Sequence, residues 1–178
     1  MRNEQSDALV TACLNGDRHA FDRLVCEYEK PVFNVVFRML NNYEEARDVT
    51  QNVFMKAFEK LRLYDNSFEF FSWIYRIAIN ESINFRTARR PQDTLDPNLG
   101  GRDNPEQNAQ QDELHEGIQD ALMNISANYR SVIVLKDLLG FSYQEIGDIL
   151  ELPQTTVKSR LYDAREQLRT LLDREAYL

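Results

Sequence analysis

The side chains best placed to do chemistry lie between Phe141 and Leu168, in the stretch FSYQEIGDILELPQTTVKSRLYDAREQL. Lysine, arginine and hydroxyl groups recur there at helical spacing, and such groups donate to phosphates and to the edges of bases. Ser142 and Glu145 have the spacing of a capping box, which predicts the start of a short helix, and Pro153 predicts a break and the start of a longer helix. This pattern predicts a DNA-binding helix-turn-helix. On the pattern alone, an ordinary helical hairpin with a solvated charged face fits equally well.

A second set of side chains, between residues 64 and 90, mixes aromatic rings with arginines and asparagines. Single-stranded DNA is held by stacking of its bases on aromatic rings within a basic groove, at about 1–3 kcal/mol per base. Trp73, Ile74 and Ile77 have the spacing of an ordinary packed core, so we assign them to the core. The side chains that we expect to face outward and to bind nucleic acid are those of the loop around Phe68 and of Arg76, Asn80, Asn84 and Arg86.

Carboxylates cluster at a third place, where Glu44, Glu45 and Asp48 share one face of a predicted helix. No second carboxylate helix and no Glu-x-x-His pair accompanies them, so a solvated or partner-binding face is favoured over a di-metal site. The sequence also lacks the phosphate-binding, dinucleotide-binding, metalloprotease and nucleophile-elbow motifs. We therefore expect no catalytic site, no metal and no cofactor.

The two cysteines and two histidines show no metal-binding spacing. Cys13 and Cys26 lie in helical patterns without a C-x-x-C, and we interpret them as small buried residues of a reducing compartment. His19 and His115 are interpreted as surface residues. No apolar run approaches the ~20 residues of a membrane span, and the N-terminus lacks the apolar core of a signal peptide. These features predict a cytoplasmic location and no direct insertion into a membrane.

Charge is unevenly distributed along the 178 residues. A net charge of −8 is unusual for a DNA-binding protein, because neutralisation of phosphates supplies most non-specific affinity. Residues 91–116 alone hold one arginine and seven acidic residues, a net charge of −6. This segment also holds three prolines and a Gly-Gly pair, a composition typical of a flexible linker.

Helical periodicity dominates the rest of the chain. Capping residues and breaks predict helices at 6–15, at 17–40 with a kink or new first turn at Pro31, at 42–61 and from about 68 to 88, with a loop at 64–67. After the linker, helices are predicted around 114–125, 129–138 and 142–150, and from 154 onward. The sequence therefore predicts an all-α fold of two small helical domains, residues 1–90 and 117–178, joined by the acidic flexible linker 91–116.

Four segments resemble the extracytoplasmic-function (group IV) sigma factors of bacterial RNA polymerase. SYQEIGDIL and TVKSRLYDAREQL closely resemble their C-terminal, σ4 helix-turn-helix domain. In the N-terminal, σ2-like part, NYEEARDVTQNVFMKAFEKL is similar to their polymerase-binding helix, and FFSWIYRIAINESINF to the helix that reads and melts the minus-ten promoter element. The resemblance implies an alternative sigma factor with core RNA polymerase and promoter DNA as partners, and it leads us to expect an anti-sigma factor as well.

The resemblance also implies roles for individual residues. Core polymerase would be bound by Glu45, Asp48, Gln51, Asn52 and Phe54. The melted minus-ten strand would be bound by Tyr64, Ser67, Phe68, Arg76, Asn80, Asn84 and Arg86, with residues 64–69 capturing a flipped base. The duplex minus-thirty-five element would be read by Gln154, Thr156, Lys158, Ser159, Tyr162 and Arg165. The sequence departs from the family's pattern at Asn52, where an acid is usual, at Thr155, where glycine is common, and at Asp163, where arginine is frequent.

The competing hypothesis is a stand-alone helix-turn-helix regulator whose N-terminal domain serves dimerisation or ligand binding. Such a regulator would bind duplex DNA by itself, whereas a sigma factor would need core polymerase. As a flexible coil, the 26 residues of the linker average only ~28–30 Å, whereas promoter elements within two turns of duplex lie up to ~70 Å apart. In the free protein the two domains can therefore fold onto each other, and we expect promoter duplex to bind weakly.

Overall fold

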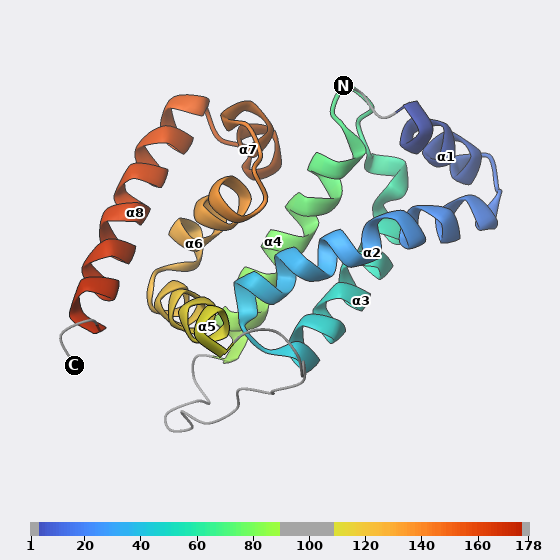
Figure 1. Ribbon diagram of the computed structural model, residues 1–178. Helices are drawn as coiled ribbons and strands as arrows, with labels where there is room; N and C mark the ends of the chain where they lie inside the picture. Colours follow the sequence, from blue (N-terminus) through green and yellow to red (C-terminus); the bar gives the residue numbers. More distant parts are fainter. Residues whose placement is uncertain (1–3, 90–108, 176–178) are drawn as a thin grey trace.

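The computed structural model describes residues 4–89 and 109–175, and these residues fold into helices joined by short turns, with no strand among them (Figure 1). In chain order the elements are α1 (Glu4–Leu14), α2 (Arg18–Leu40), α3 (Tyr43–Lys60), the 3-10 turn η1 (Leu61–Leu63), α4 (Phe70–Arg89), α5 (Ala109–Asn124), α6 (Ala127–Ile133), the π-helical turn η2 (Val134–Leu138), α7 (Tyr143–Leu150) and α8 (Gln154–Glu175). None of these helices is long and apolar enough to cross a membrane. The expected all-α fold is confirmed, with α1 to α4 in one domain and α5 to α8 in the other.

Side-chain caps fix where three of the helices begin. Asp17 accepts a hydrogen bond from the backbone N–H two residues later, at 3.0 Å, and α2 starts directly after it. Asn42 accepts the N–H of Glu45 at 3.0 Å and starts α3. Ser142 and Glu145 form both halves of a capping box, at 3.2 and 2.7 Å, and start α7. Each cap satisfies an N–H that the helix itself leaves unpaired, so the sequence predicted these three starts correctly.

Helices α2, α3 and α4 pack against one another to form the core of the N-terminal domain, and α1 packs on α2. Of the two alternatives predicted at Pro31, a kink or a new first turn, the new first turn is wrong, because α2 is a single helix that contains this proline. The proline removes one backbone hydrogen bond, but Tyr28 and Val32 on either side are 6% and 0% exposed and hold the helix in the core. Ser6 is buried within α1, with its hydroxyl 2.9 Å from that of Tyr28.

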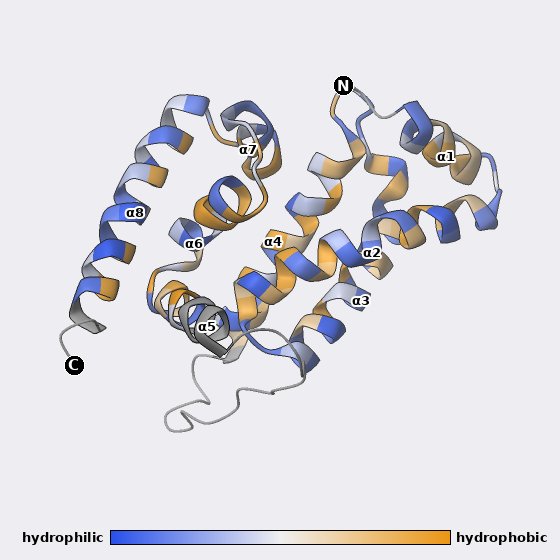
Figure 2. Ribbon diagram, in the orientation of Figure 1, coloured by the Kyte–Doolittle hydropathy of each residue, from blue (hydrophilic) through white to orange (hydrophobic). Residues whose placement is uncertain are grey.

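In the C-terminal domain, α8 packs along α6 and α5. Its buried face consists of Val157, Leu161 and Ala164, which are at most 2% exposed. Figure 2 shows the hydrophobic positions of α8 on the side toward α6 and hydrophilic positions on the outer side. The packing therefore leaves the outer face of α8 in solvent.

The two domains contact each other along α4 and α2. Helix α4 lies against α7, and α2 lies against α5, α6 and η2 (Figure 1). The rings of Phe71 and Phe141 stack with 5.6 Å between their centres. Gln119 and Arg38 exchange two hydrogen bonds, of 3.1 and 3.0 Å. The two domains therefore lie against each other in the structure.

Part of the predicted linker is helical. Helix α5 starts at Ala109, so residues 109–116 of the predicted linker have helical backbone. This part of the segment, AQQDELHE, holds no proline or glycine and is rich in residues of high helix propensity. The rest of the predicted linker, up to residue 108, lies outside the described residues.

Candidate nucleic-acid interface

The helix-turn-helix predicted from the sequence is formed by α7, a turn at residues 151–153 and α8. Glu151 ends α7 in the left-handed conformation, at φ 55° and ψ 45°, and the N–H of Leu152 donates to the carbonyl of Gly147 at 3.0 Å. The chain passes so close to Gly147 that a Cβ there would lie 2.7 Å from the carbonyl oxygen of Leu152. The turn therefore depends on the missing side chain of Gly147, which sequence reasoning did not single out.

The outer face of α8 carries most of the side chains predicted to read duplex DNA. Gln154, Lys158, Ser159 and Tyr162 are exposed, Tyr162 to 68%. Thr156 is half-buried, and its carbonyl accepts a hydrogen bond from the Ser159 hydroxyl at 3.1 Å. The structure thus brings these predicted residues together at the N-terminal end of one helix.

Two basic side chains of α8 are held by neighbouring residues. The ammonium of Lys158 lies 5.4 Å from the centre of the Tyr143 ring, within range of a cation-π contact. Arg165 pairs with Asp137, its Nε lying 3.0 Å from Oδ2 and its Nη2 contacting Oδ1. The hydrogen bonds and charge of Asp137 raise the pKa of Arg165 above its ordinary value. If Arg165 contacts DNA as predicted, its guanidinium would therefore bind DNA and the Asp137 carboxylate at the same time.

The loop between η1 and α4 is tied into a defined turn. Tyr64 is half-buried, with its hydroxyl 2.7 Å from the carbonyl oxygen of Phe68 and its ring centre 5.4 Å from that of Trp73. Asp65 accepts the N–H of Ser67 at 2.9 Å, and this hydrogen bond lowers the pKa of Asp65. Ser67 and Phe68 are exposed, Phe68 to 40%. Two of the three predicted strand-binding residues of the loop thus face solvent, whereas Tyr64 supports the loop from within.

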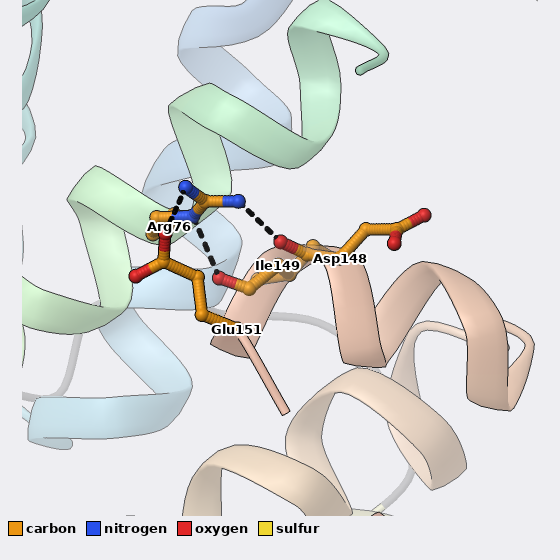
Figure 3. Close-up of polar contacts among 4 residues, drawn as sticks. All are labelled: Arg76, Asp148, Ile149 and Glu151. Atoms are coloured by element: carbon orange, nitrogen blue, oxygen red, sulfur yellow. Dashed lines mark hydrogen bonds and ion pairs between the residues drawn. The ribbon is translucent and has the colours of Figure 1, made fainter. Parts of the chain in front are cut away.

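The polar side of α4 is divided between solvent and the C-terminal domain. Asn80 and Asn84 are exposed, as predicted. Arg76 instead reaches the C-terminal end of α7 (Figure 3), and Arg86 lies 3.5 Å from the sulfur of Met123 in α5. The expectation that both arginines face outward is wrong for this structure, because the C-terminal domain lies against their side of α4 and offers acceptors to them.

Helix α3 presents the polar face predicted to bind polymerase. Asp48, Gln51 and Asn52 are exposed, and Glu45 is half-buried near the start of the helix. Phe54 is only 9% exposed and belongs to the core of the domain. Its contribution to binding would therefore be to position α3 rather than to touch a partner.

An apolar surface that sequence reasoning missed lies beside this polar face. Tyr43, Met55 and Phe58 are 54%, 55% and 52% exposed, and they border a hollow of ≈ 880 Å³ between α2 and α3. Thr50 lines the same hollow, and its buried hydroxyl has no hydrogen-bond partner among the described residues. Phe58 has the spacing of the buried residues of α3, yet it is half exposed. Hydrophobic periodicity predicts which face of a helix a residue lies on, but not how completely neighbouring helices cover that face.

Sequence reasoning also missed that Arg130, in α6, is buried. Its position directly before the largely apolar run SVIVL was a sequence signal that could have indicated this burial. Its side chain is 1% exposed. At distances of 2.5 to 3.0 Å, its guanidinium donates to the carbonyls of Met39, Leu122, Met123 and Ile125. Burial, followed by the charge of Arg86, lowers the pKa of Arg130 to about 9. Arg130 therefore ties the end of α5 to the end of α2, across the two domains.

Within the described residues, no group of three or more His, Cys, Asp or Glu side chains is placed to hold a metal ion. Cys13 is half-buried, and burial raises the pKa of its thiol. Cys26 is exposed, so its interpretation as a buried residue is wrong, because its position on α2 faces away from the core. His19 is exposed, as expected, and the side chain of His115 lies outside the described residues.

Three surfaces together define the class of this protein. One domain carries a helix-turn-helix whose second helix has an exposed polar face. The other carries an exposed loop with an aromatic ring at residue 68 and an exposed polar face on α3. This combination defines a two-domain, all-helical DNA-binding protein.

Known proteins share both halves of this pattern. Residues 24–92 match Sigma-70 region 2, and residues 115–168 match Sigma-70, region 4. The RNA polymerase sigma-H factor of Pseudomonas aeruginosa is 31% identical over 94% of each chain. The ECF RNA polymerase sigma factor SigW of Bacillus subtilis is 34% identical over 88% of this chain and 91% of its own. The chain therefore belongs to the sigma-70 family, in its extracytoplasmic-function group.

Solved structures agree on the fold. CnrH, in complex with the cytosolic domain of CnrY, matches with a TM-score of 0.71 at 24% identity, over 95% of this chain and 97% of that chain. The sigma factor RpoE of Bartonella quintana, in complex with the anti-sigma factor NepR, matches with a TM-score of 0.63 at 24% identity, over 86% and 96%. The protein is an alternative sigma factor that directs transcription initiation, and its family binds core RNA polymerase and promoter DNA. The hypothesis of a stand-alone regulator is set aside on these matches.

Proposed function

We propose that promoter recognition is divided between the two domains. The σ2-like domain, residues 1–90, binds core polymerase through α3 and the melted minus-ten strand through the loop at 64–69 and α4. The σ4-like domain, which includes residues 117–178, reads the duplex minus-thirty-five element through α8. The acidic segment between them joins the two DNA-binding surfaces.

The exposed face of α8 is the observation that carries this proposal. Its inner face is buried in the domain, and the close approach at Gly147 sets it against α7. The exposed side chains of Gln154, Lys158 and Tyr162 then stand in the first half of the helix. In helix-turn-helix proteins this end of the second helix enters the major groove and contacts the edges of bases. Lys158 is suited to this role because its ammonium donates to the N7 and O6 of guanine.

The loop at 64–69 has the features expected of a site for an unpaired base. Tyr64 and Asp65 hold the backbone of the loop through hydrogen bonds of 2.7 and 2.9 Å, so the exposed ring of Phe68 has a defined position. A base stacks on such a ring whatever its identity. Asn80 and Asn84 add exposed amide groups one turn apart on α4, which can donate and accept hydrogen bonds with bases.

The polar face of α3 is suited to a protein partner rather than to DNA. Asp48 carries a negative charge, which phosphates would repel, and Gln51 and Asn52 add neutral polar groups beside it. The exposed Met55 and Phe58 follow on the same helix, and apolar side chains next to polar ones are typical of protein interfaces. Bound there, core polymerase would perform the chemistry of RNA synthesis. The role proposed for this chain therefore needs no catalytic group of its own and places it in the cytoplasm, with polymerase.

An anti-sigma factor is a further proposed partner. The solved relatives CnrH and RpoE are held in complexes with the cytosolic domain of CnrY and with the anti-sigma factor NepR. The apolar surface formed by Tyr43, Met55 and Phe58 is available on this chain for a protein of that kind. Its occupation would compete with the binding of polymerase to α3.

Transcription by core polymerase reconstituted with this protein tests the proposal. The transcripts should start at a set of promoters that share a minus-thirty-five and a minus-ten element, and core polymerase alone should not start there. The free protein should bind the same promoter duplexes only weakly. If the protein alone bound them tightly and specifically, and added nothing to core polymerase, the stand-alone regulator would be the better description.

A further inference from the structure

The ring of Tyr143 is in contact with two ammonium groups. The ammonium of Lys136 lies 4.9 Å from the ring centre and that of Lys158 lies 5.4 Å from it, and both distances are within the ~6 Å range of a cation-π contact. Lys136 comes from η2 and Lys158 from the exposed face of α8, whereas Tyr143 is the first residue of α7. One aromatic ring therefore connects the start of the helix-turn-helix to the face of α8 proposed to read DNA.

The position of the ring is set by the fold of its own domain. Tyr143 is half-buried and packs against the core. It directly follows Ser142, whose capping box with Glu145 fixes the backbone at the start of α7. Lys136 is fixed as well, because its ammonium donates to the carbonyl of Phe141 at 3.0 Å. The ring is therefore held in place independently of DNA.

The side chain of Lys158 has no other support of this kind. It is exposed, and among the residues that the structure describes it has no hydrogen bond or ion pair, so the Tyr143 ring is the group that holds its ammonium. A lysine has a flexible stem of four carbons, and its conformational freedom is lost when it binds a partner. The ring contact removes part of that freedom before DNA arrives.

We propose that Tyr143 is a positioning residue for promoter readout, because its ring holds the Lys158 ammonium in place while the ammonium donates to a base. The proposal rests on the role proposed above for Lys158. An ammonium has three N–H donors. The face of one ring takes at most one of them, so the others are left for the N7 and O6 of a guanine. Tyr143 thereby acts on the reading of sequence through Lys158 and without touching DNA itself.

The second cation predicted to contact DNA from α8 is supported from the same segment. Arg165 follows Lys158 by seven residues, which is two helical turns, and pairs with Asp137 of η2. Asp137 is the residue after Lys136, within the π-helical turn that leads from α6 towards α7. Such turns are frequent at functional sites. The segment 136–143 therefore holds both cations along one edge of α8.

A series of substitutions at Tyr143 separates the charge of the ring from its size. Tyr143→Phe keeps the ring and removes the hydroxyl. Fluorine atoms added one at a time to that ring, up to trifluorophenylalanine, withdraw electron density from its face with little change in size, and Tyr143→Leu removes the ring. Each full-length protein is assembled with core polymerase, and its affinity is measured for a promoter and for the same promoter changed at the base that Lys158 reads. Thermal unfolding checks that each protein is folded.

Each added fluorine should weaken binding to the unchanged promoter. Between Tyr143→Phe and its trifluoro form the loss should reach about threefold, the strength of an exposed cation-π contact. Binding to the changed promoter should stay the same, so discrimination between the two falls by the same factor. Tyr143→Phe should discriminate as well as wild type does, and Tyr143→Leu should resemble the trifluoro protein.

Four results of this series would overturn the proposal. Binding that tightens with fluorination would show that the ring competes with DNA for Lys158. An equal loss on both promoters would show that the ring only supports the fold. A loss of discrimination already complete in Tyr143→Phe would assign the effect to the hydroxyl. A series without any change in binding would show that the contact has no part in readout.

The same series in two further backgrounds identifies the cation through which the ring acts. In Lys158→Ala the fluorine atoms should change nothing. In Lys136→Met, which removes the other ammonium and keeps an apolar stem, the loss of discrimination should remain. An effect that persists in Lys158→Ala, or that disappears in Lys136→Met, would assign the ring to Lys136 and reject the proposal.

Promoter-specific transcription by the same proteins separates this inference from the proposed function. Transcription by wild type, together with a loss of discrimination in Lys158→Ala but none along the Tyr143 series, would reject the positioning role and leave the proposed function standing. A Lys158→Ala protein that binds both promoters as wild type does would reject the proposed role of Lys158 and the inference with it. A lack of transcription by wild type with core polymerase would reject the proposed function as a whole.

Discussion

At the scale of single residues, Gly147 decides how closely α7 and α8 approach each other. A methyl group at this position would lie 2.7 Å from the backbone carbonyl oxygen of Leu152, and that atom cannot swing away as a flexible side chain could. The helix-turn-helix pattern predicted the two helices and their turn. The pattern did not predict how close the backbone of Gly147 lies to the Leu152 carbonyl, because this distance depends on how α7 and α8 pack against each other after the turn.

Gly147→Ala should therefore lower the free energy of unfolding by about 1–3 kcal/mol, the usual cost of forcing extra volume into a packed site. Chemical denaturation measures this change. Gly117→Ala is the control, because a Cβ there meets nothing within 4 Å and α5 should gain about 0.5–1 kcal/mol from it. A Gly147→Ala protein as stable as wild type would contradict the close approach.

Lys158 is the second residue with a sharp expectation. Lys158→Ala should weaken binding of the assembled polymerase to the minus-thirty-five element by about 1–3 kcal/mol if the ammonium donates to a base. The loss should shrink on promoters mutated at the base that Lys158 reads. Arg169→Ala, at an arginine 75% exposed and three turns further along α8, is the control for lost charge. An equal loss on all sequences would make Lys158 a phosphate contact, and no loss would remove it from the site.

At the scale of elements, capping residues in the sequence were sufficient to predict where helices begin. They did not predict which other helices pack against them. The caps at Asp17, Asn42 and Ser142 act within three residues of sequence, so helix starts were predictable. The partners of Arg76 and of Arg130 lie some 70 and 90 residues away, at Asp148 and Met39, and no periodicity carries that information. On α8 and in the loop most of the predicted residues lie at the surface, whereas two predicted arginines on α4 contact the C-terminal domain.

For α3, the expected result is a loss of polymerase binding without a loss of folding. Asp48→Arg and Gln51→Ala change exposed side chains, so the thermal midpoint should stay within a few degrees of wild type. Charge reversal at an interface commonly costs several kcal/mol, so Asp48→Arg should abolish co-purification with core polymerase. Asp22→Arg, at an aspartate 75% exposed on α2, is the matched reversal. Equal co-purification of the Asp48 and Asp22 variants would count against the α3 face.

For the loop and α4, substitutions should separate the melting of DNA from its initial binding. Phe68→Ala removes a stacking surface worth about 1–3 kcal/mol per base, and Asn80→Ala removes an exposed amide. Both should impair the open promoter complex more than the closed one, because only the open complex contains an unpaired strand. Fluorescence of a base analogue in the minus-ten strand follows this step. Equal losses at both steps, or a thermal midpoint lowered by several degrees, would indicate a packing role instead.

At the scale of the whole molecule, negative charge is concentrated along the sequence in residues 91–116, between the two domains proposed to bind DNA. Neutralising the acids of the predicted linker should strengthen non-specific duplex binding by the free protein, and the gain should fade as salt rises. The acids to be replaced by their amides are Asp93, Asp96, Asp103 and Glu106. A control protein carries the same change at four exposed acids elsewhere, namely Asp22, Glu29, Glu59 and Asp173. A salt titration in which both proteins gain equally would show that net charge matters and its position does not.

Trp73 is the only tryptophan of the chain, and its ring centre lies 5.4 Å from that of Tyr64 and 5.7 Å from that of Phe70. Tyr64 and Phe70 flank the loop proposed to capture the promoter strand. All tryptophan emission of the free protein therefore arises at this one place, and Tyr64 passes excitation energy to it over a short distance. We expect a strand that displaces the Tyr64 hydroxyl from the Phe68 carbonyl to change that emission, and duplex bound to α8 to leave it unchanged. Tryptophan fluorescence should therefore follow the proposed strand capture without an added dye.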